Sequence, residues 1–293
     1  MMLLMASYVK AADCFVNFDG EGWMLNRNGK VGIYLDGITD KGIRRAVCDL
    51  CKDIQKVCDA EAVVSDNTDV AIVVRVSPKM KATEKFIIEI DGQGQMTITG
   101  SDKRGAIYGI YEVSRQIGVS PWYYWADVPI EKHPQIWLIP GTYTDGEPAV
   151  RYRGIFLNDE APCLTSWVKN TFNTDFGGHE FYEKVFELIL RLKGNFLWPA
   201  MWSWAFYADD PLNSPLADEM GVVIGTSHHE PMARNHQEWA RHRKEYGAWN
   251  YQTNKAVLDK FFREGMERAK NTEDVITIGM RGDGDEAMSD QLV

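Results

Sequence analysis

Long apolar runs and cysteines are scarce in this sequence of 293 residues, and basic residues are fewer than acidic ones. No apolar run is long enough to cross a bilayer as a helix. Acidic residues outnumber basic ones by 42 to 32, which gives a net charge of -10 and argues against non-specific binding to nucleic acid or an anionic membrane. The start, MMLLMASYVKAADCFV, has no positive residue before its apolar patch, so it makes a poor signal peptide and leaves the compartment unknown.

The five cysteines do not indicate a disulfide framework, because their number is odd and only one pair has the C-x-x-C spacing. That pair, Cys48 and Cys51, lies in KGIRRAVCDLCKDIQKVC, where apolar residues recur at helical spacing. A redox or zinc pair is one interpretation. We favour the simpler one, in which the cysteines of this helix, including Cys58, are small buried thiols on its core face.

Aromatic residues, by contrast, are abundant, with 10 Trp, 12 Tyr and 12 Phe. They cluster in PWYYWADVP at 121–129 and in WPAMWSWAFY at 198–207. Core packing explains some of these side chains. A cleft that stacks flat, partly apolar ligands such as sugar rings explains the clustering better.

Residues 30–145 alternate between strand and helix patterns. Strands are expected over 30–36, 69–76, 85–102 (a hairpin) and 136–143, and helices over 41–59 and 103–118. A polar, turn-rich segment at 144–150 is the best domain boundary. We therefore predict an N-terminal mixed α/β sandwich domain over residues 1–147.

Past residue 150 the pattern becomes strand, polar cluster and helix, repeated. The strands are expected over 152–157, 195–202, 221–225 and 275–279, with helices over 180–194, 234–247 and 254–270, the last N-capped by Thr253. Apolar strands that alternate with helices indicate a parallel sheet. Ligands of such folds bind at the carboxyl ends of the strands, at the rim of a barrel or an open sheet.

Three carboxylates, Asp283, Asp285 and Glu286, follow the last of these strands in VITIGMRGDGDEAM. The glycines among them let the chain turn sharply after the strand. The spacing does not fit an EF-hand calcium loop. A magnesium site, a pair for acid/base chemistry and a solvated loop all remain open interpretations.

Polar clusters follow the other strands as well. SHHEPM lacks the spacing and the helix of a zinc-binding H-E-x-x-H motif, so a hydrogen-bonding role for His228 is favoured over a metal ligand. FLNDE places Asp159 and Glu160 at a strand end, although Asn-Asp is also common in turns. NFLWPAMW offers Asn195 and Trp198 for contact with a sugar.

These stretches resemble glycoside hydrolase family 115, the xylan α-glucuronidases. The resemblance rests on GSDKRGAIYGIYEVSRQIGVSPWYYWADVP, YRGIFLNDE, RLKGNFLWPAMW, DPLNSPLADEMGVVIGTSHHEPM, WNYQTNK and TIGMRGDGDE, which cover most of 100–286. It implies an α/β fold in which an N-terminal α/β domain precedes a (β/α)8 barrel of the TIM type. It also implies removal of α-1,2-linked glucuronic acid, or its 4-O-methyl ether, from xylan, with inversion and without a metal or other cofactor.

The resemblance and the strand-end acids together suggest roles for single residues. An inverting glycosidase needs a carboxylic acid and a carboxylate about 6.5–9.5 Å apart. We expect Asp285, ahead of Glu286, to be the acid, with Glu160 and Asp159 as candidates for positioning or for the second carboxylate. The expected substrate contacts are Asp159, Asn195, Trp198, His228, Arg281, Trp249 and Tyr251, of which Arg281 and His228 would meet the uronate. No metal ligand is expected.

A full barrel takes about 250 residues, whereas residues 148–293 supply four strand–helix units. We therefore expect the first half of a barrel there, a second carboxylate beyond Val293 and an inactive chain when it is alone. The expected partner of the full-length enzyme is glucuronoxylan or its oligosaccharides, and a homodimer is left open. Two alternatives remain: a non-hydrolytic carbohydrate-binding or regulatory protein with an aromatic-lined cleft, and a metal-dependent barrel enzyme.

Overall fold

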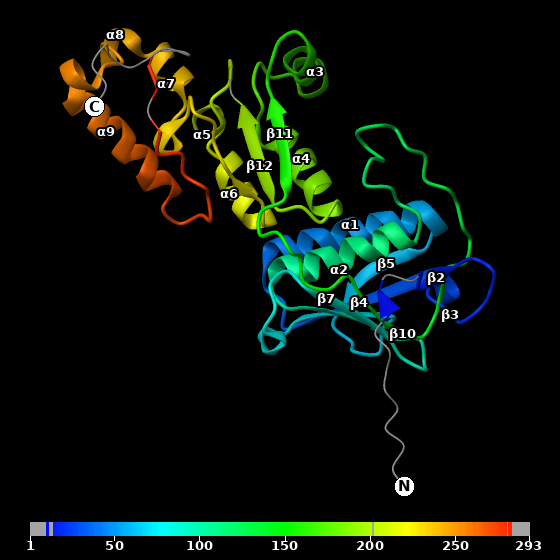
Figure 1. Ribbon diagram of the computed structural model, residues 1–293. Coiled ribbons are helices and arrows are strands. Elements are labelled where there is room, and N and C mark those ends of the chain that lie inside the picture. Colours follow the sequence, from blue (N-terminus) through cyan, green and yellow to red (C-terminus); the bar gives the residue numbers. More distant parts are fainter. Residues whose placement is uncertain (1–9, 12–13, 201, 280, 283–293) are drawn as a thin grey trace. The chain divides into compact units, whose positions relative to one another are not determined.

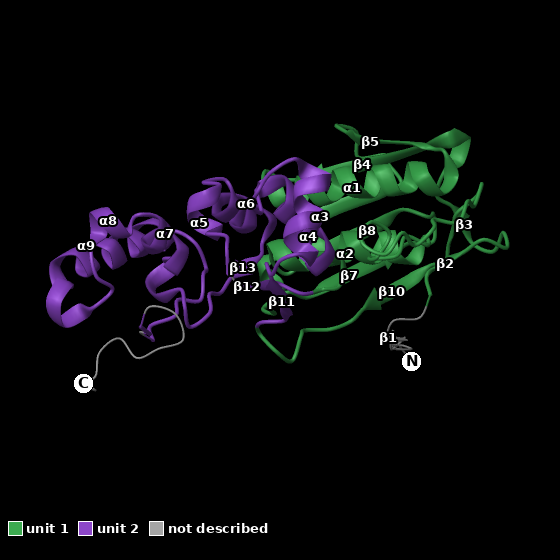
Figure 2. Cartoon of the chain, turned by 90° about the horizontal axis from the view of Figure 1, so that it is seen from above, with its two compact units in different colours: residues 1–151, 190–193 green, residues 152–189, 194–293 purple. Residues whose placement is uncertain are grey.

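The structure is a computed structural model that describes residues 10–11, 14–200, 202–279 and 281–282 (Figure 1). The chain divides into two compact units (Figure 2). Unit 1 comprises residues 1–151 with 190–193, and unit 2 comprises residues 152–189 with 194–293. Both contain strands and helices, so the fold is mixed α/β, as the sequence predicts. None of the described helices is long and apolar enough to span a membrane.

Unit 1 is built on a seven-stranded sheet in the order β1-β10-β7-β8-β6-β4-β5. Its strands are β1 (Lys10–Ala11), β4 (Lys30–Asp36), β5 (Glu61–Ser65), β6 (Ile72–Val76), β7 (Phe86–Ile90), β8 (Met96–Gly100) and β10 (Gly141–Thr144). The strands β5, β4, β6 and β8 run parallel, whereas β7 is antiparallel to β8 and β10. A smaller sheet pairs β9 (Trp137–Leu138) with β2 (Val16–Asn17) and β3 (Trp23–Met24).

The hairpin expected over 85–102 is confirmed as the antiparallel pair of β7 and β8. Its turn is fixed by Asp91, whose Oδ1 accepts the backbone N–H of Gln93 at 2.8 Å and of Gln95 at 2.9 Å. Gly94 completes the turn with φ of +87°, and a Cβ there would lie 2.6 Å from Cβ of Trp23. The turn therefore requires glycine both for its backbone conformation and for space.

Helices α1 (Lys41–Cys58) and α2 (Lys103–Gln116) lie side by side on the large sheet (Figure 1). Each begins at an aspartate N-cap: Asp40 accepts the N–H of Ile43 at 3.0 Å, and Asp102 accepts that of Gly105 at 2.8 Å. Both helices lie where the sequence predicts them. They cover the aliphatic core of unit 1.

The cysteines of α1 are less buried than the sequence predicts. Cys48 is exposed, and Cys51 and Cys58 are only partly buried. The larger aliphatic side chains of the predicted stripe, such as Leu50 and Ile54, occupy the core-facing positions instead. All of these thiols are free, and burial raises the pKa of Cys51 to about 11, which keeps it in the unreactive thiol form.

Unit 2 contains a three-stranded parallel sheet in the order β11-β12-β13. Its strands are β11 (Gly154–Asn158), β12 (Phe196–Ala200) and β13 (Val223–Ile224). Its helices are α3 (Cys163–Phe172), α4 (His179–Arg191), α5 (Phe206–Asp209), α6 (Asn213–Met220), α7 (His236–Arg241), α8 (Arg243–Tyr246) and α9 (Tyr251–Ala269), of which α4 ends within unit 1. The predicted alternation of parallel strands with helices is thus present.

The fourth strand, expected over 275–279, is reduced among the described residues to one parallel bridge between Val275 and Gly225. Hydrogen bonds from side chains take the place of the other backbone hydrogen bonds that a regular strand would form. Asp274 Oδ1 accepts the backbone N–H of Ile224 at 3.3 Å, and the Thr277 hydroxyl donates to the carbonyl of Thr226 at 2.6 Å. The segment therefore lies along β13 without forming a regular strand.

The helices at the end of unit 2 also depart from the prediction. The polar helix expected over 234–247 is divided into α7 and α8, which meet at His242. Helix α9 begins with Asn250 rather than Thr253 as its N-cap, and the Asn250 side chain accepts the N–H of Gln252 and of Thr253. Asn254 has a non-helical φ of -133° inside the first turn, and Asn250 rather than Thr253 is the residue placed to cap the helix.

The apolar face of α4 is buried except at its end. Phe181, Val185 and Leu188 are buried, whereas Leu192 lies beyond the last residue of the helix and is 43% exposed. Phe181 contacts the ring of Trp204 edge-on, with centroids 5.8 Å apart. Described residues of the chain therefore cover most of this face.

Candidate active site

The carboxyl ends of β11, β12 and β13 lie at one edge of the sheet of unit 2, because the three strands are parallel. Asp159 directly follows β11, the segment 202–205 follows β12, and the segment 226–230 follows β13. Ligands of parallel α/β folds bind at this edge. The side chains of these three segments therefore define the candidate site.

Asp159 is a buried carboxylate that holds the segment after β12 in place. Its Oδ1 accepts the backbone N–H of Trp202 at 2.5 Å, and its Oδ2 accepts those of Ser203 at 2.9 Å and Trp204 at 2.8 Å. Hydrogen bonds to a charged acceptor are stronger than neutral ones. Asp159, expected to contact substrate, thus uses both oxygens to shape the loop.

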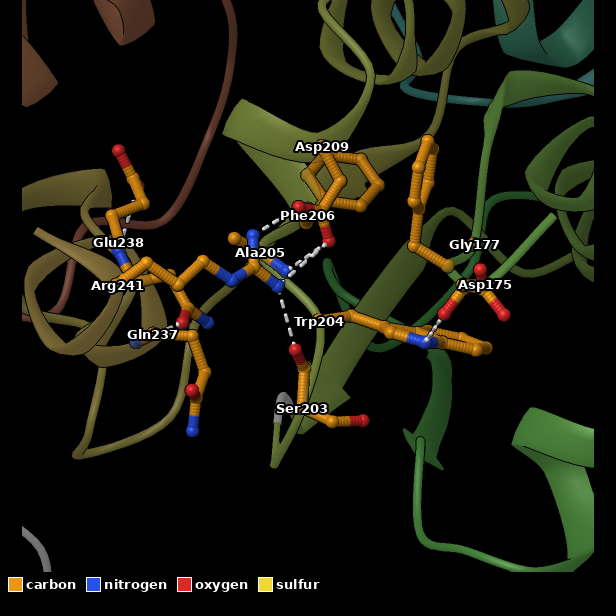
Figure 3. Close-up of polar contacts among 12 residues, drawn as sticks. Asp175, Gly177, Ser203, Trp204, Ala205, Phe206, Asp209, Gln237, Glu238 and Arg241 are labelled. Carbon is orange, nitrogen blue, oxygen red and sulfur yellow. Dashed lines mark hydrogen bonds and ion pairs between the residues drawn. The ribbon is translucent and has the colours of Figure 1, made fainter.

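Further polar contacts hold the same loop (Figure 3). The Trp204 indole N–H donates to the carbonyl of Asp175 at 3.0 Å, and Asp209 accepts the backbone N–H of Ala205 at 2.7 Å. Arg241 of α7 donates to the carbonyl of Ser203 at 2.7 Å and forms an ion pair with Asp209. The loop is thus held by Asp159 and by these further partners, so its shape is set before any ligand arrives.

Glu230 is the second buried carboxyl of the site, with 1% of its surface exposed. Its Oε2 accepts hydrogen bonds from the backbone N–H of Ser227, at 2.8 Å, and from the Ser227 hydroxyl. Its Oε1 is buried and has no hydrogen-bond partner among the residues that the structure describes. Burial, together with the negative charge of Asp159, raises the pKa of Glu230 to about 7, although the Ser227 hydrogen bonds oppose the shift.

Sequence reasoning missed Glu230, because SHHEPM was considered only for its histidines. A usable signal was present: Glu230 is the one carboxylate in the cluster after β13. The loop that carries it is tightly closed, since the Thr226 hydroxyl donates to the Glu230 carbonyl at 2.8 Å. Thr277 anchors the loop further through its bond to Thr226 and by accepting the N–H of Met232 at 2.9 Å.

Exposed rings stand beside these carboxyls. His228 is exposed, and its ring centroid lies 4.2 Å from that of the half-buried His229. The Trp202 ring, 54% exposed, lies 6.0 Å from His229. The predicted contact residue His228 thus shares a loop with Glu230, and Trp202 adds an indole to the same group.

Two of the predicted sugar-binding residues do not lie at the carboxyl end of β12. Trp198 is partly exposed within the strand and contacts Phe156 of β11 edge-on at 5.4 Å. Asn195 is fully buried before the strand begins, where its side chain accepts the N–H of Arg153 at 2.8 Å. A ligand at the carboxyl ends would therefore lie at the opposite end of β12 from Asn195. Glu160, next to Asp159, is exposed.

The remaining predicted residues belong to an aromatic cluster near α9. Trp249 is 7% exposed and packs edge-on against Trp239 and Phe261. Its indole N–H donates to the carbonyl of Arg281 at 2.6 Å, so Trp249 holds the backbone of a predicted uronate contact. The Tyr251 hydroxyl donates to Asp259 at 2.7 Å.

The two leading catalytic candidates, Asp285 and Glu286, lie outside the described residues. Within the described ranges, no three His, Cys, Asp or Glu side chains gather closely enough to hold a metal ion. The chemistry visible at the site is therefore that of one hydrogen-bonded carboxylate, one carboxyl that holds a proton near neutral pH, and exposed imidazole and indole rings.

Paired carboxyls with aromatic rings at the carboxyl ends of parallel strands are typical of glycoside hydrolases. The sequence profile of Glycosyl hydrolase family 115 matches residues 145–292. A solved structure, BtGH115A, described as a family GH115 4-O-methyl-α-glucuronidase with specificity for decorated arabinogalactans, is 31% identical and superposes with a TM-score of 0.81. The chain belongs to glycoside hydrolase family 115.

The match with BtGH115A covers 95% of this chain but only 38% of that one. A mutant β-hexosaminidase of Streptomyces plicatus is 17% identical over 78% of this chain and 46% of its own, with a TM-score of 0.51. A β-N-acetylhexosaminidase of Bacteroides fragilis is 12% identical over 84% and 52%, with a TM-score of 0.50. These two likenesses concern the fold alone. No curated protein matches the chain by sequence.

Proposed function

We propose that the protein acts as a glycoside hydrolase that removes α-1,2-linked glucuronic acid, or its 4-O-methyl ether, from glucuronoxylan or its oligosaccharides. The observation that carries this proposal is the match of residues 145–292 to glycoside hydrolase family 115, in a chain that brings the buried carboxyl groups of Asp159 and Glu230 to the strand ends. Carboxyl groups kept in different protonation states are what glycosidic cleavage requires. The specificity of BtGH115A for decorated arabinogalactans makes such polymers the rival substrate.

The proposed reaction is an inverting hydrolysis. A carboxylic acid, for which Asp285 stands ahead of Glu286, protonates the glycosidic oxygen as the bond to the sugar carbon breaks. A carboxylate accepts a proton from a water molecule that attacks the opposite face of the sugar. Glu160 is a candidate for this second group. His228 and Arg281 would bind the uronate carboxylate.

We further propose that residues 148–293 form the first units of a (β/α)8 barrel. Parallel strands that alternate with helices support this, as does the bridge that brings Val275 alongside β13. Phe156 and Trp198, on neighbouring strands, leave one face of the sheet apolar and exposed. Further barrel strands would cover such a face.

The test is sugar release by the purified full-length enzyme. Glucuronoxylan, xylo-oligosaccharides with a single glucuronic acid and glucuronate-decorated arabinogalactan are compared, and the anomer first released is identified by proton NMR. We expect β-configured free uronic acid from the xylan substrates, and no loss of activity with EDTA. Binding without release would favour the non-hydrolytic carbohydrate-binding protein. Loss with EDTA and recovery with a divalent ion would favour the metal-dependent enzyme.

A further inference from the structure

Glu230 has an unusual hydrogen-bond arrangement for a carboxyl group inside a protein. Both donors of Ser227 bond to the same oxygen, Oε2, and the other oxygen is buried without a partner among the described residues. An ionised carboxylate would leave negative charge on that unpaired oxygen in a medium that solvates it poorly. A neutral carboxylic acid fits better, with Oε2 as the acceptor and the proton on Oε1.

The surroundings favour the same form. Asp159, whose oxygens hold three backbone N–H groups, places a negative charge near Glu230 and opposes a second one. On the loop of Glu230 itself, His228 is exposed and His229 half-buried. Ser227 stabilises the ionised form through its two bonds, but the loss of hydration outweighs this contribution.

We propose that Glu230 is a positioning residue that must stay protonated for the site to accept an anionic sugar, so that it sets the selectivity of the site for uronates. This inference rests on the proposed function. A uronate brings a carboxylate to a site that already contains Asp159. If Glu230 were ionised as well, the substrate would meet two buried negative charges in place of one. Affinity for the anion should therefore depend on the Glu230 proton, whereas affinity for an uncharged analogue should not.

The experiment measures the dissociation constants of glucuronate and of its neutral analogue glucuronamide for the full-length protein by calorimetry between pH 5.5 and 8.5. For the wild type, we expect glucuronate binding to weaken above about pH 7, approaching tenfold per pH unit as one group loses its proton. Glucuronamide binding should change less than threefold. Glu230→Gln, which keeps the shape and the neutral charge, should bind glucuronate with the same small pH dependence as glucuronamide.

The matched control is Glu238→Gln. Glu238 is also a buried glutamate of unit 2, but it forms ion pairs with Arg234 at 3.0 Å and Arg268 at 2.6 Å. This variant should keep the pH dependence of the wild type. If Glu230→Gln also kept the pH dependence of the wild type, the inference would be overturned. The proposed function would still stand if the protein bound glucuronate and released uronic acid.

Two other outcomes also decide the matter. A folded Glu230→Gln protein that binds glucuronate normally but releases no uronic acid at any pH would mean that Glu230 supplies the proton of the reaction, and the positioning role would be wrong. If the wild type bound neither sugar and released no uronic acid, the proposed function would fail first. The protonation of Glu230 could then still be measured separately, from the carboxyl carbon shift of the labelled protein, which should move near pH 7 and be missing in Glu230→Gln.

Discussion

At the scale of the residue, the site depends on two buried carboxyl groups with different hydrogen-bond environments. Asp159 is buried but surrounded by backbone N–H donors, which compensate its charge. Glu230 is buried with donors on one oxygen only, and the field of Asp159 acts against its ionisation. Each group is therefore also a stability determinant, and the two should respond differently to substitution.

Glu230 should contribute less to the stability of the protein as the pH rises through the titration range of its carboxyl group. The folded pKa of about 7 lies above the ordinary value of 4.5, so the folded state binds the extra proton between these two values. The contribution of Glu230 to the free energy of unfolding must therefore decrease as the pH rises from about 4.5 to 7. Glu230→Gln removes this loss, and its stability relative to the wild type should rise by up to about 3 kcal/mol over that range. Urea denaturation at pH 4.5, 6 and 8 measures the gap, and a constant gap would contradict the shift.

Removal of the Asp159 carboxylate should release the loop after β12. Asp159→Ala leaves three backbone N–H groups without their acceptor, which should cost about 3 kcal/mol in the free energy of unfolding. Hydrogen exchange of the amides of 202–204 should speed up at the same time. Glu160→Ala is the matched control, because Glu160 is the exposed neighbour and should leave both quantities nearly unchanged. Unchanged exchange in Asp159→Ala would show that other contacts suffice to hold the loop.

At the scale of the element, turns and caps decide where each strand and helix ends. The β7–β8 hairpin shows this most directly, because Asp91 supplies its hydrogen bonds and Gly94 its left-handed residue. In unit 2, the extent of the last strand depends on partners that are distant in the sequence. Asp274 and Thr277 bond to β13 through their side chains, so a segment with an apolar strand pattern contributes only one bridge.

The hairpin provides a comparison between two neighbouring glycines. Gly94→Ala must accommodate a Cβ at φ of +87° and 2.6 Å from Trp23, so we expect a loss of about 2 kcal/mol or more in the stability of unit 1. Gly92→Ala meets no heavy atom within 4 Å at an ordinary φ and should be close to neutral. Urea denaturation of both variants, followed by tryptophan fluorescence, measures the difference. Equal effects would mean that the turn relaxes around the new side chain.

At the scale of the whole molecule, the chain corresponds to only part of a related family 115 enzyme. The chain matches BtGH115A over 95% of its own length but over only 38% of that protein. Family 115 membership and the strand-end carboxyls together direct a test of activity to Asp285, which lies outside the described residues.

If Asp285 protonates the leaving oxygen, Asp285→Asn in the full-length enzyme should lower kcat on glucuronoxylan by at least about a hundredfold. An aryl glucuronide, whose leaving group needs little protonation, should be much less affected. Steady-state kinetics on both substrates separate the roles. Equal losses on both would indicate positioning, and near-normal kcat would remove Asp285 from the mechanism.

The sequence by itself determined the local elements and the family. Helical spacing in 41–58, alternation in the hairpin and the strand–helix pattern past residue 150 are short-range properties, because each is set by neighbours along the chain. The same holds for the motifs from which family 115 was identified. They are contiguous stretches, and the profile of the family covers those that lie within residues 145–292.

Only the tertiary structure decided which polar side chains are buried, and with what partners. Asn195 and Trp249 resembled sugar contacts in sequence, but one closes the start of β12 and the other packs among aromatic rings. Asp159 became a loop anchor because residues 202–204 fold back onto it. Glu230 acquired its proton affinity from burial and from a charge 71 positions earlier in the chain, at Asp159. Burial and electrostatic fields are sums over neighbours in space, which no local pattern in the sequence contains.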